Sequence, residues 1–486
     1  MVSDSTKSII SGSFWMMLQT VSLKVISFFS QILLALILMP EVFGKVALVT
    51  AITNITFITQ QFGIQDVLIR RGKAFGLWYE TAKSLTLFVS IIAFVISLLI
   101  GWLYGYFTND LEISLLVLIL SFSLPFQALS ILPNSKLRIN LEFKFLAQIK
   151  VVELLSIQVG IILLALLDFG VYSFVYPVLF VAIINCLYLY YKTNIQFNFK
   201  LHLRKWRILF NDSLYGFYFA LASRTSFQID YIILGFFATQ AEVGLYFMAF
   251  TIAVQAIGLL AANLPSVIFP TLNKIKLTNI ELGLKLQTLI IVLSIFGAIL
   301  TSWQFFCAEY LVHLFLSEKW FSIVNLIQIL SLGMFFRILS SQWVVPLKLN
   351  GEFDKLARIA AISLVVMVAL LFPLAYFYKA LGIAYGVSIY YFVISFYQLY
   401  KSLKNYEINL LSLFLKTNML LGFSLIAFYG SHFLAEYIID GSTKLLLVIK
   451  LVITSVIGLL FFVIMLRLFH KQYYFTVADK IKSLKK

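Results

Sequence analysis

Apolar segments of roughly twenty or more residues, the length of a membrane-spanning helix, recur along the whole chain and constrain its fold more than any other feature. Each is long enough to cross a hydrocarbon core about 30 Å thick. They lack the polar and apolar alternation that is typical of membrane-spanning strands. We therefore expect an all-α polytopic membrane protein with about fourteen transmembrane helices, at residues 14–38, 45–68, 84–107, 112–133, 146–167, 170–191, 212–237, 243–268, 286–306, 321–345, 358–378, 380–400, 411–434 and 445–467.

Lysines and arginines gather in alternate loops between these segments. One set of loops carries most of the cations, whereas the other set carries only Lys45, Lys319, Lys379 and Lys444. By the positive-inside rule the first set is cytoplasmic, which places both termini in the cytoplasm. The formal net charge of +16 is therefore an orientation signal, and we expect no nucleic-acid partner.

The sequence also contains an internal repeat. Residues 140–149 (NLEFKFLAQI) resemble residues 350–359 (NGEFDKLARI) at an offset of 210, and EVFG at 41–44 resembles EVG at 242–244. The matches fall in equivalent loops, which predicts two parallel halves of six helices each. The predicted organisation is an N-terminal six-helix lobe at 1–191, a basic cytoplasmic linker at 192–210, a C-terminal six-helix lobe at 211–403, and two extra transmembrane helices with a basic cytoplasmic tail at 404–486.

The first span carries a lysine near its middle, where a cation costs about 2.5–3.5 kcal/mol on insertion-based scales. Lys24 corresponds to Arg224, which lies 200 residues later at a similar depth of the seventh span. Gln31 shares the helical face of Lys24, and Gln228 shares the face of Arg224. Long basic side chains can snorkel or form structural ion pairs. The mid-depth position and the repeat favour a cavity that binds an anionic substrate.

Further polar residues extend this predicted cavity. The second span and its repeat counterpart, the eighth span, carry amides that either bind a sugar or join neighbouring helices, including Asn54, Gln60, Gln61 and Gln255. Glu153 and Asp230 are candidate counter-ions or ion-coupling groups. Arg337, in the tenth span, fits a substrate-binding role and snorkelling equally well. For Lys450, near the outer end of the last span, we expect snorkelling.

Several signatures of catalysis are missing from the sequence. It contains no G-x-x-x-x-G-K-[ST] motif for nucleotide phosphates, and its two cysteines and four histidines form no metal-ligand spacing. No loop between the spans is long enough to form a folded soluble domain. We therefore expect no cofactor, no metal and no enzymatic activity.

Four motifs resemble one family of membrane proteins. They are P-E-x-F-G at Pro40–Gly44, F-G-I-x-x-x-L-I-R-R at Phe62–Arg71, P-N-S-K-L-R-I-N-L-E-F-K at Pro133–Lys144 and E-V-G-L-Y at Glu242–Tyr246. On these residues the chain resembles the polysaccharide-transporter (Wzx-like) branch of the multidrug/oligosaccharidyl-lipid/polysaccharide (MOP) flippase superfamily, which has a MATE/MurJ-like fold.

The resemblance implies a flippase for undecaprenyl-diphosphate-linked oligosaccharide repeat units in the bacterial cytoplasmic (inner) membrane. It also implies alternating access between two six-helix lobes, with cations in the cavity. The product would be a surface polysaccharide such as O-antigen, capsule or exopolysaccharide. The expected partners are the lipid-linked oligosaccharide, the membrane, a glycan polymerase and other polysaccharide-assembly proteins.

Two other functions stay open on the sequence alone. A MATE-like drug/ion antiporter would favour an acidic cavity for cationic compounds, whereas the mid-depth charges here are mostly basic. A membrane-embedded glycan polymerase or glycosyltransferase would need a sizeable outer loop with catalytic polar residues, and the spans leave no such loop. The flippase is favoured over both.

Overall fold

The computed structural model describes residues 2–57, 64–71, 75–195, 206, 214–254, 279–406, 408–441 and 443–469. Within these residues the secondary structure is helical and contains no strand. The chain divides into two compact units, residues 1–244 and residues 245–486. The first unit includes residues 211–244, which the sequence analysis assigned to the second lobe. The predicted boundaries at 191 and 210 stay a prediction.

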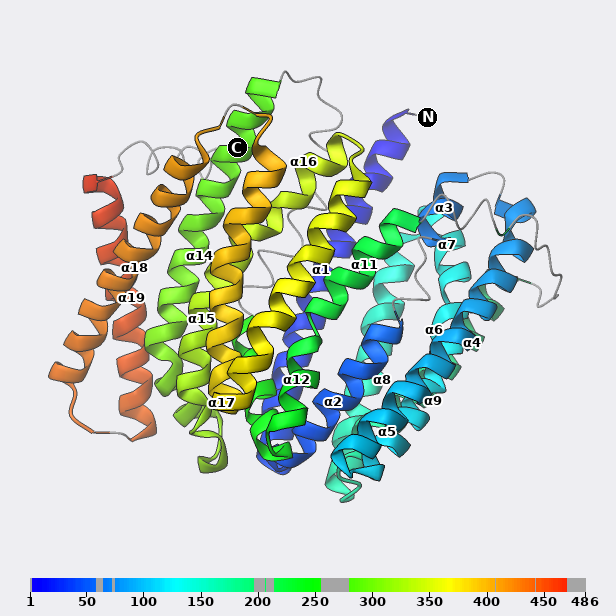
Figure 1. Ribbon diagram of the computed structural model, residues 1–486, viewed down its shortest axis with the longest axis horizontal. Helices are drawn as coiled ribbons and strands as arrows, with labels where there is room; N and C mark the ends of the chain where they lie inside the picture. Colours follow the sequence, from blue (N-terminus) through cyan, green and yellow to red (C-terminus); the bar gives the residue numbers. More distant parts are fainter. Residues whose placement is uncertain are drawn as a thin grey trace. The chain divides into compact units, whose positions relative to one another are not determined.

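The first unit is built around long helices that pack lengthwise on their neighbours (Figure 1). In particular, α1 packs on α8, α4 on α5, and α8 on α9. Its helices are α1 (Val2–Ile37), α2 (Pro40–Phe57), α3 (Ile64–Arg71), α4 (Phe75–Thr108), α5 (Leu111–Ser121), α6 (Ser123–Leu129), α7 (Ile131–Ile139), α8 (Phe143–Leu166), α9 (Tyr172–Thr193), α11 (Leu214–Ser226) and α12 (Ile229–Phe237).

The second unit contains α17 (Phe353–Leu403), the longest helix among the described residues. In the same unit, α14 packs on α15, α18 and α19. The apolar helix Gln240–Val254 contains the boundary between the units. The other helices of the second unit are α14 (Asn279–Phe315), α15 (Ile323–Ser340), α16 (Val344–Leu349), α17 (Phe353–Leu403), α18 (Leu410–Ile438) and α19 (Lys444–Phe469).

Ten helices among the described residues are long and apolar enough to cross a membrane. One of them, α17, covers the predicted eleventh and twelfth spans. Lys379, which has non-helical backbone angles (φ 47° and ψ −127°), divides it into two parts. The predicted spans at 45–68 and 243–268 run into residues outside the described part of the chain. The predicted span at 212–237 is divided between α11 and α12. The predicted all-α polytopic membrane fold is confirmed.

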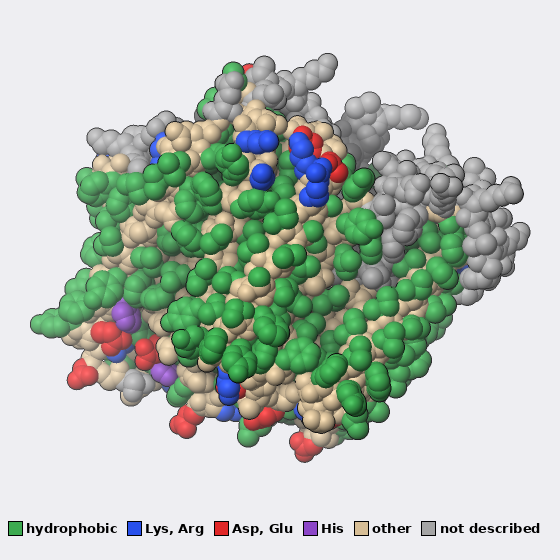
Figure 2. All heavy atoms as spheres, viewed as in Figure 1, with side chains coloured by type: hydrophobic (Ala, Val, Ile, Leu, Met, Phe, Trp, Pro, Cys, Tyr) green, Lys and Arg blue, Asp and Glu red, His purple; other side chains and the backbone are tan. Residues whose placement is uncertain are grey.

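The outer faces of the long helices are apolar, as expected for contact with lipid. On α4 the exposed side chains include Ile91, Val95 and Leu99, and on α19 they include Val452 and Val456. Figure 2 shows hydrophobic side chains along most of the visible face, with charged side chains mainly toward the helix ends. This distribution satisfies the requirement that lipid-facing surfaces carry few charges.

The repeated E-V-(F)-G motifs lie against each other within the first unit. A Cβ atom added to Gly44 would stand 1.9 Å from the carbonyl oxygen of Gln240, and one added to Gly244 would stand 1.8 Å from that of Pro40. The contact is thus reciprocal between positions 200 residues apart. Any side chain larger than that of glycine would force the two helix starts apart.

Candidate functional site

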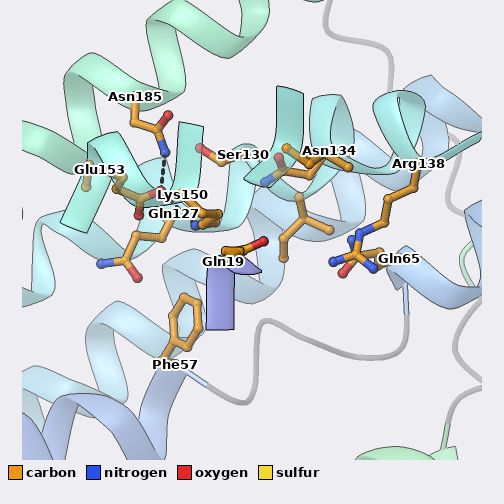
Figure 3. A pocket seen from close by; sticks show the side chains of 13 residues that line it. Gln19, Phe57, Gln65, Gln127, Ser130, Asn134, Arg138, Lys150, Glu153 and Asn185 are labelled. Carbon is orange, nitrogen blue, oxygen red and sulfur yellow. Dashed lines mark hydrogen bonds and ion pairs between the residues drawn. The ribbon is translucent and has the colours of Figure 1, made fainter. Parts of the chain in front are cut away.

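A polar cavity of about 230 Å³ lies inside the first unit, between α1, α2, α3 and α6 to α9 (Figure 3). Three charged side chains line it: Arg138, Lys150 and Glu153. Five carboxamides also line it: Gln19, Gln65, Gln127, Asn134 and Asn185. Such a concentration of polar groups among membrane-spanning helices is costly unless it binds something polar. We therefore take this cavity as the candidate site.

Helical periodicity brings these side chains together. On α7, Asn134 and Arg138 are four residues apart and share a face. On α8, Leu146, Lys150 and Glu153 follow the spacing i, i+4, i+7, which again defines one face. Each helix therefore presents one side to the cavity, while its other side packs on neighbouring helices or faces lipid.

An ion pair and an amide close one wall of the cavity. Glu153 Oε2 accepts hydrogen bonds from Lys150 Nζ at 2.7 Å and from Asn185 Nδ2 at 2.8 Å. The dashed lines in Figure 3 show how the carboxylate joins α8 to α9. The Lys150 charge is therefore compensated inside the protein. Glu153, predicted as a counter-ion or ion-coupling group, lies at this site, and its role in coupling stays a prediction.

Three buried polar atoms of the lining residues have no hydrogen-bond partner in the protein: Arg138 Nε, Asn134 Oδ1 and Gln19 Oε1. A buried donor or acceptor without a partner costs about 1–3 kcal/mol. Native proteins rarely accept this cost three times around one space, and such groups usually mark a site for water or a ligand. The cavity is therefore suited to bind a molecule with several hydrogen-bonding groups.

The two central cations predicted from the sequence lie outside this cavity. Lys24 is half-buried on α1, five residues after Gln19, and does not line the cavity. Gln31 is half-buried two turns further along α1. Arg224 is exposed on α11, two residues before that helix ends. The role of these residues in substrate binding stays a prediction.

One geometric expectation for the seventh span is wrong. Gln228 does not continue the helical face of Arg224, because a turn at residues 227–228 separates α11 from α12 and Gln228 is the N-cap of α12. A helical face holds only while the backbone stays helical. Asp230, in the first turn of α12, is buried, and its Oδ1 accepts a hydrogen bond from the Tyr231 amide at 3.0 Å.

The other predicted residues are dispersed. Asn54 is exposed on α2, and Gln60, Gln61 and Gln255 lie outside the described residues. In the second unit, the Arg337 guanidinium lies 5.7 Å from the centre of the Tyr391 ring, and its Nη1 lies 3.6 Å from Met334 Sδ. Both contacts suit a cation held among apolar helices.

Lys450 does not snorkel as expected. It is 5% exposed, and its Nζ donates to Glu436 Oε2 at 2.6 Å. Glu436 Oε1 in turn accepts a hydrogen bond from the Tyr310 hydroxyl at 2.6 Å, and that hydroxyl lies 2.9 Å from His432 Nδ1. This cluster joins α14, α18 and α19. The described residues contain no group of three or more potential metal ligands.

Several polar lining residues were not predicted from the sequence: Gln19, Gln127, Asn134, Arg138, Lys150 and Asn185. Arg138 lies between the predicted spans at 112–133 and 146–167, where a cation indicates orientation rather than binding. The P-N-S-K-L-R motif was placed in a loop, whereas residues 131–139 form α7 and continue the preceding helix. The i, i+4 spacing of Asn134 and Arg138 was the signal that could have placed them on one face.

The fold and the sequence both match known membrane proteins. The family described as "Polysaccharide biosynthesis protein" matches residues 33–325. The structure of the lipid II flippase MurJ in an inward closed conformation has a TM-score of 0.74 at 15% identity, covering 93% of this chain and 98% of that one. No curated protein sequence matches the chain.

Two further structures are MATE transporters. VcmN of Vibrio cholerae has a TM-score of 0.54 at 15% identity, covering 84% of this chain and 98% of that one. A MATE transporter in a bent conformation has a TM-score of 0.50 at 16% identity, covering 85% and 97%. At these identities the matches establish the fold alone. The resemblance to the polysaccharide-transporter branch with a MATE/MurJ-like fold is confirmed.

Proposed function

Because this chain belongs to the polysaccharide biosynthesis protein family, we propose that it is a flippase for lipid-linked oligosaccharides. It moves undecaprenyl-diphosphate-linked repeat units from the cytoplasmic to the outer leaflet of the bacterial inner membrane. A glycan polymerase and other assembly proteins then convert these units into a surface polysaccharide, such as O-antigen, capsule or exopolysaccharide.

The observation that carries this proposal is the polar cavity between Gln19, Asn134, Arg138 and Glu153 in a unit made of membrane-spanning helices. A protein that only anchors others in a membrane has no need for such a cavity. The cavity borders the end of α7 and the first turns of α8, next to a loop that the charge distribution places in the cytoplasm. The cavity is therefore near the side of the membrane from which a lipid-linked substrate made in the cytoplasm would enter.

In the proposed cycle the lipid tail stays in the bilayer while the polar head enters the protein from the cytoplasmic side. Lys24 and Arg224 attract the diphosphate, and Arg337 remains a proposed substrate contact. Asn54 and the amides on the predicted second and eighth spans meet the glycan. The protein then changes from an inward-open to an outward-open state. An inside-negative potential favours outward movement of an anion by about 2.3 kcal/mol per charge per 100 mV.

The test is to locate the lipid-linked repeat unit in a strain that lacks this protein. Loss of the flippase should trap single repeat units on the inner leaflet. Loss of a polymerase would leave single units on the outer leaflet, and loss of a drug antiporter would change drug sensitivity without trapping any unit. Repeat units that still reach the outer leaflet, with no alternative flippase present, would disprove the proposal.

A double variant tests the two predicted cations. We expect the combined Lys24→Gln and Arg224→Gln substitutions to stop surface-polymer production, because the diphosphate loses both counter-charges. Membrane insertion and the amount of protein should be unchanged. Normal polymer in this double variant would remove both residues from the binding site without contradicting the flippase itself.

A further inference from the structure

We propose that the cavity lined by Arg138, Asn134 and Gln19 binds one sugar ring of the substrate through its hydroxyl groups, and not the diphosphate. This inference rests on the proposed flippase function and specifies which chemical part of the substrate the cavity recognises. It follows from the hydrogen-bonding inventory, the charge and the size of the cavity.

The first argument is the hydrogen-bonding inventory. The buried atoms without protein partners are one donor, Arg138 Nε–H, and two acceptors, Asn134 Oδ1 and Gln19 Oε1. An ionised diphosphate only accepts hydrogen bonds, so it can satisfy the arginine but neither amide oxygen. Each sugar hydroxyl donates one hydrogen bond and also accepts.

The second argument is charge. Lys150 is already paired with Glu153, which also accepts a hydrogen bond from Asn185. Arg138 therefore supplies the remaining positive charge of the lining, and the Glu153 carboxylate lines the same space. A diphosphate carries more negative charge than the net single positive charge of this lining compensates. A neutral polyhydroxyl group meets no such penalty.

The third argument is size. About 230 Å³ is below the roughly 300–1,000 Å³ of pockets that take drug-sized ligands. The cavity can hold one ring but not a whole repeat unit. Figure 3 shows the ring of Phe57 projecting from the end of α2 toward the polar side chains. An aromatic wall beside convergent polar groups suits the C–H face and the hydroxyl rim of a sugar ring.

The experiment crosslinks the native ligand to the position of Phe57. Phe57→p-azidophenylalanine places a photoreactive group on an aromatic ring that already lines the cavity. Cells of the native host that make the polysaccharide are irradiated, and the full-length protein is purified. Mild acid then hydrolyses the bond between the first sugar and the diphosphate. A ligand captured through its sugar leaves glycan on the protein, whereas one captured through its lipid diphosphate leaves the lipid diphosphate.

The matched control is Phe180→p-azidophenylalanine, because Phe180 lies in the same unit and is 59% exposed on α9. We expect a glycan-bearing adduct at position 57 and none at position 180. Addition of Arg138→Gln should lower the glycan adduct at least about tenfold, and addition of Asn134→Ala about twofold to tenfold. An adduct at position 57 that keeps lipid diphosphate instead of glycan, or no adduct above the control, would overturn the proposal.

A second measurement does not depend on the labelled variant. Purified Arg138→Gln protein is compared with the unmodified protein for binding of undecaprenyl diphosphate alone and of the same lipid carrying the native repeat unit. We expect the bare lipid to bind equally within twofold and the glycan-bearing lipid to bind about tenfold more weakly. An equal loss for both ligands would assign Arg138 to the diphosphate. Failure of the flippase proposal would appear separately, in the leaflet assay.

Discussion

At one corresponding position the two repeats make interhelical contacts of different chemistry. In the first repeat, Glu153 of α8 accepts from Asn185 of α9 at 2.8 Å and is paired with Lys150. At an offset of 210, Glu153 corresponds to Ser363 on α17. Ser363 Oγ accepts from Gln398 Nε2 at 3.1 Å, and these two residues are only 3% and 7% exposed.

The same offset extends the contrast to the rest of the cavity. Lys150 corresponds to Ala360, and Asn134 corresponds to the apolar Val344. In the second repeat, the neutral, buried hydrogen bond between Ser363 and Gln398 is thus sufficient to join the two parts of α17 on either side of Lys379. The charges of the first repeat exceed what this packing requires. Such an excess indicates a binding role, because natural proteins accept local cost at functional sites.

The largest expected effect comes from giving the second repeat the charge of the first. Ser363→Glu places a carboxylate where no lysine precedes it by three residues, since position 360 is alanine. An uncompensated buried charge costs about 3–5 kcal/mol, so the melting temperature of the purified protein should fall strongly.

Addition of Ala360→Lys should restore much of that loss, because it recreates the i, i+3 pair seen between Lys150 and Glu153. A melting temperature that stays unchanged in Ser363→Glu alone would mean that this region is as hydrated as the first cavity. The contrast between the repeats would then be lost.

Arg138→Gln should have the next largest effect, on transport and not on stability. A hydrogen bond from a charged group contributes about 1.5–3 kcal/mol, so transport of the lipid-linked unit in proteoliposomes should fall roughly tenfold to a hundredfold. The repeat counterpart of Arg138 is Lys348, and Lys348→Gln is the matched control. Similar losses in both variants would show that the two repeats contribute equally.

Asn134→Ala should lower transport by a smaller factor. A neutral hydrogen bond contributes about 0.5–1.5 kcal/mol, which corresponds to a twofold to tenfold loss. Its control is Val344→Ala, which removes apolar volume at the corresponding position of α16 and should leave transport per folded molecule unchanged. The initial transport rate, normalised to the folded protein, is the measurement. Unchanged transport in Asn134→Ala would remove its amide from the sugar contact.

Features that depend on local sequence were predictable. The apolar runs indicated the ten long apolar helices of the described residues, and the motif pairs predict the repeat, since both signals involve neighbouring residues. The reciprocal contact of Gly44 and Gly244 is consistent with that repeat. Glu153 was selected as a charged residue inside a span, and it indeed lines the cavity. A buried charge in an apolar segment is a signal that needs no knowledge of the tertiary structure.

Features that depend on the exact course of the backbone were not predictable. Arg138 follows the end of an apolar run at Pro133, so it was assigned to a loop, although α7 continues to Ile139. The turn at residues 227–228 interrupts a segment that the sequence predicts as one span. Lys450 finds Glu436 on another helix, which no local pattern indicates. The cavity assembles side chains from seven helices and is therefore a property of the tertiary structure.

The smallest expected effect distinguishes two roles of Glu153. Glu153→Gln keeps an oxygen that can accept from Asn185 and resembles the neutral Ser363–Gln398 contact of the second repeat. The released Lys150 is 41% exposed, and ion pairs with this much water access contribute only about 0–1 kcal/mol. If the carboxylate serves only as a counter-ion to Lys150, loss of this energy should change the transport rate of the lipid-linked unit by no more than about fivefold. Binding of undecaprenyl diphosphate without glycan should stay within about twofold, because the diphosphate does not occupy this cavity. A transport rate that falls far more than about tenfold in correctly folded Glu153→Gln protein would instead make Glu153 an ion-coupling group. The charge of the first repeat would then be required for transport itself, and not only for the structure of the cavity.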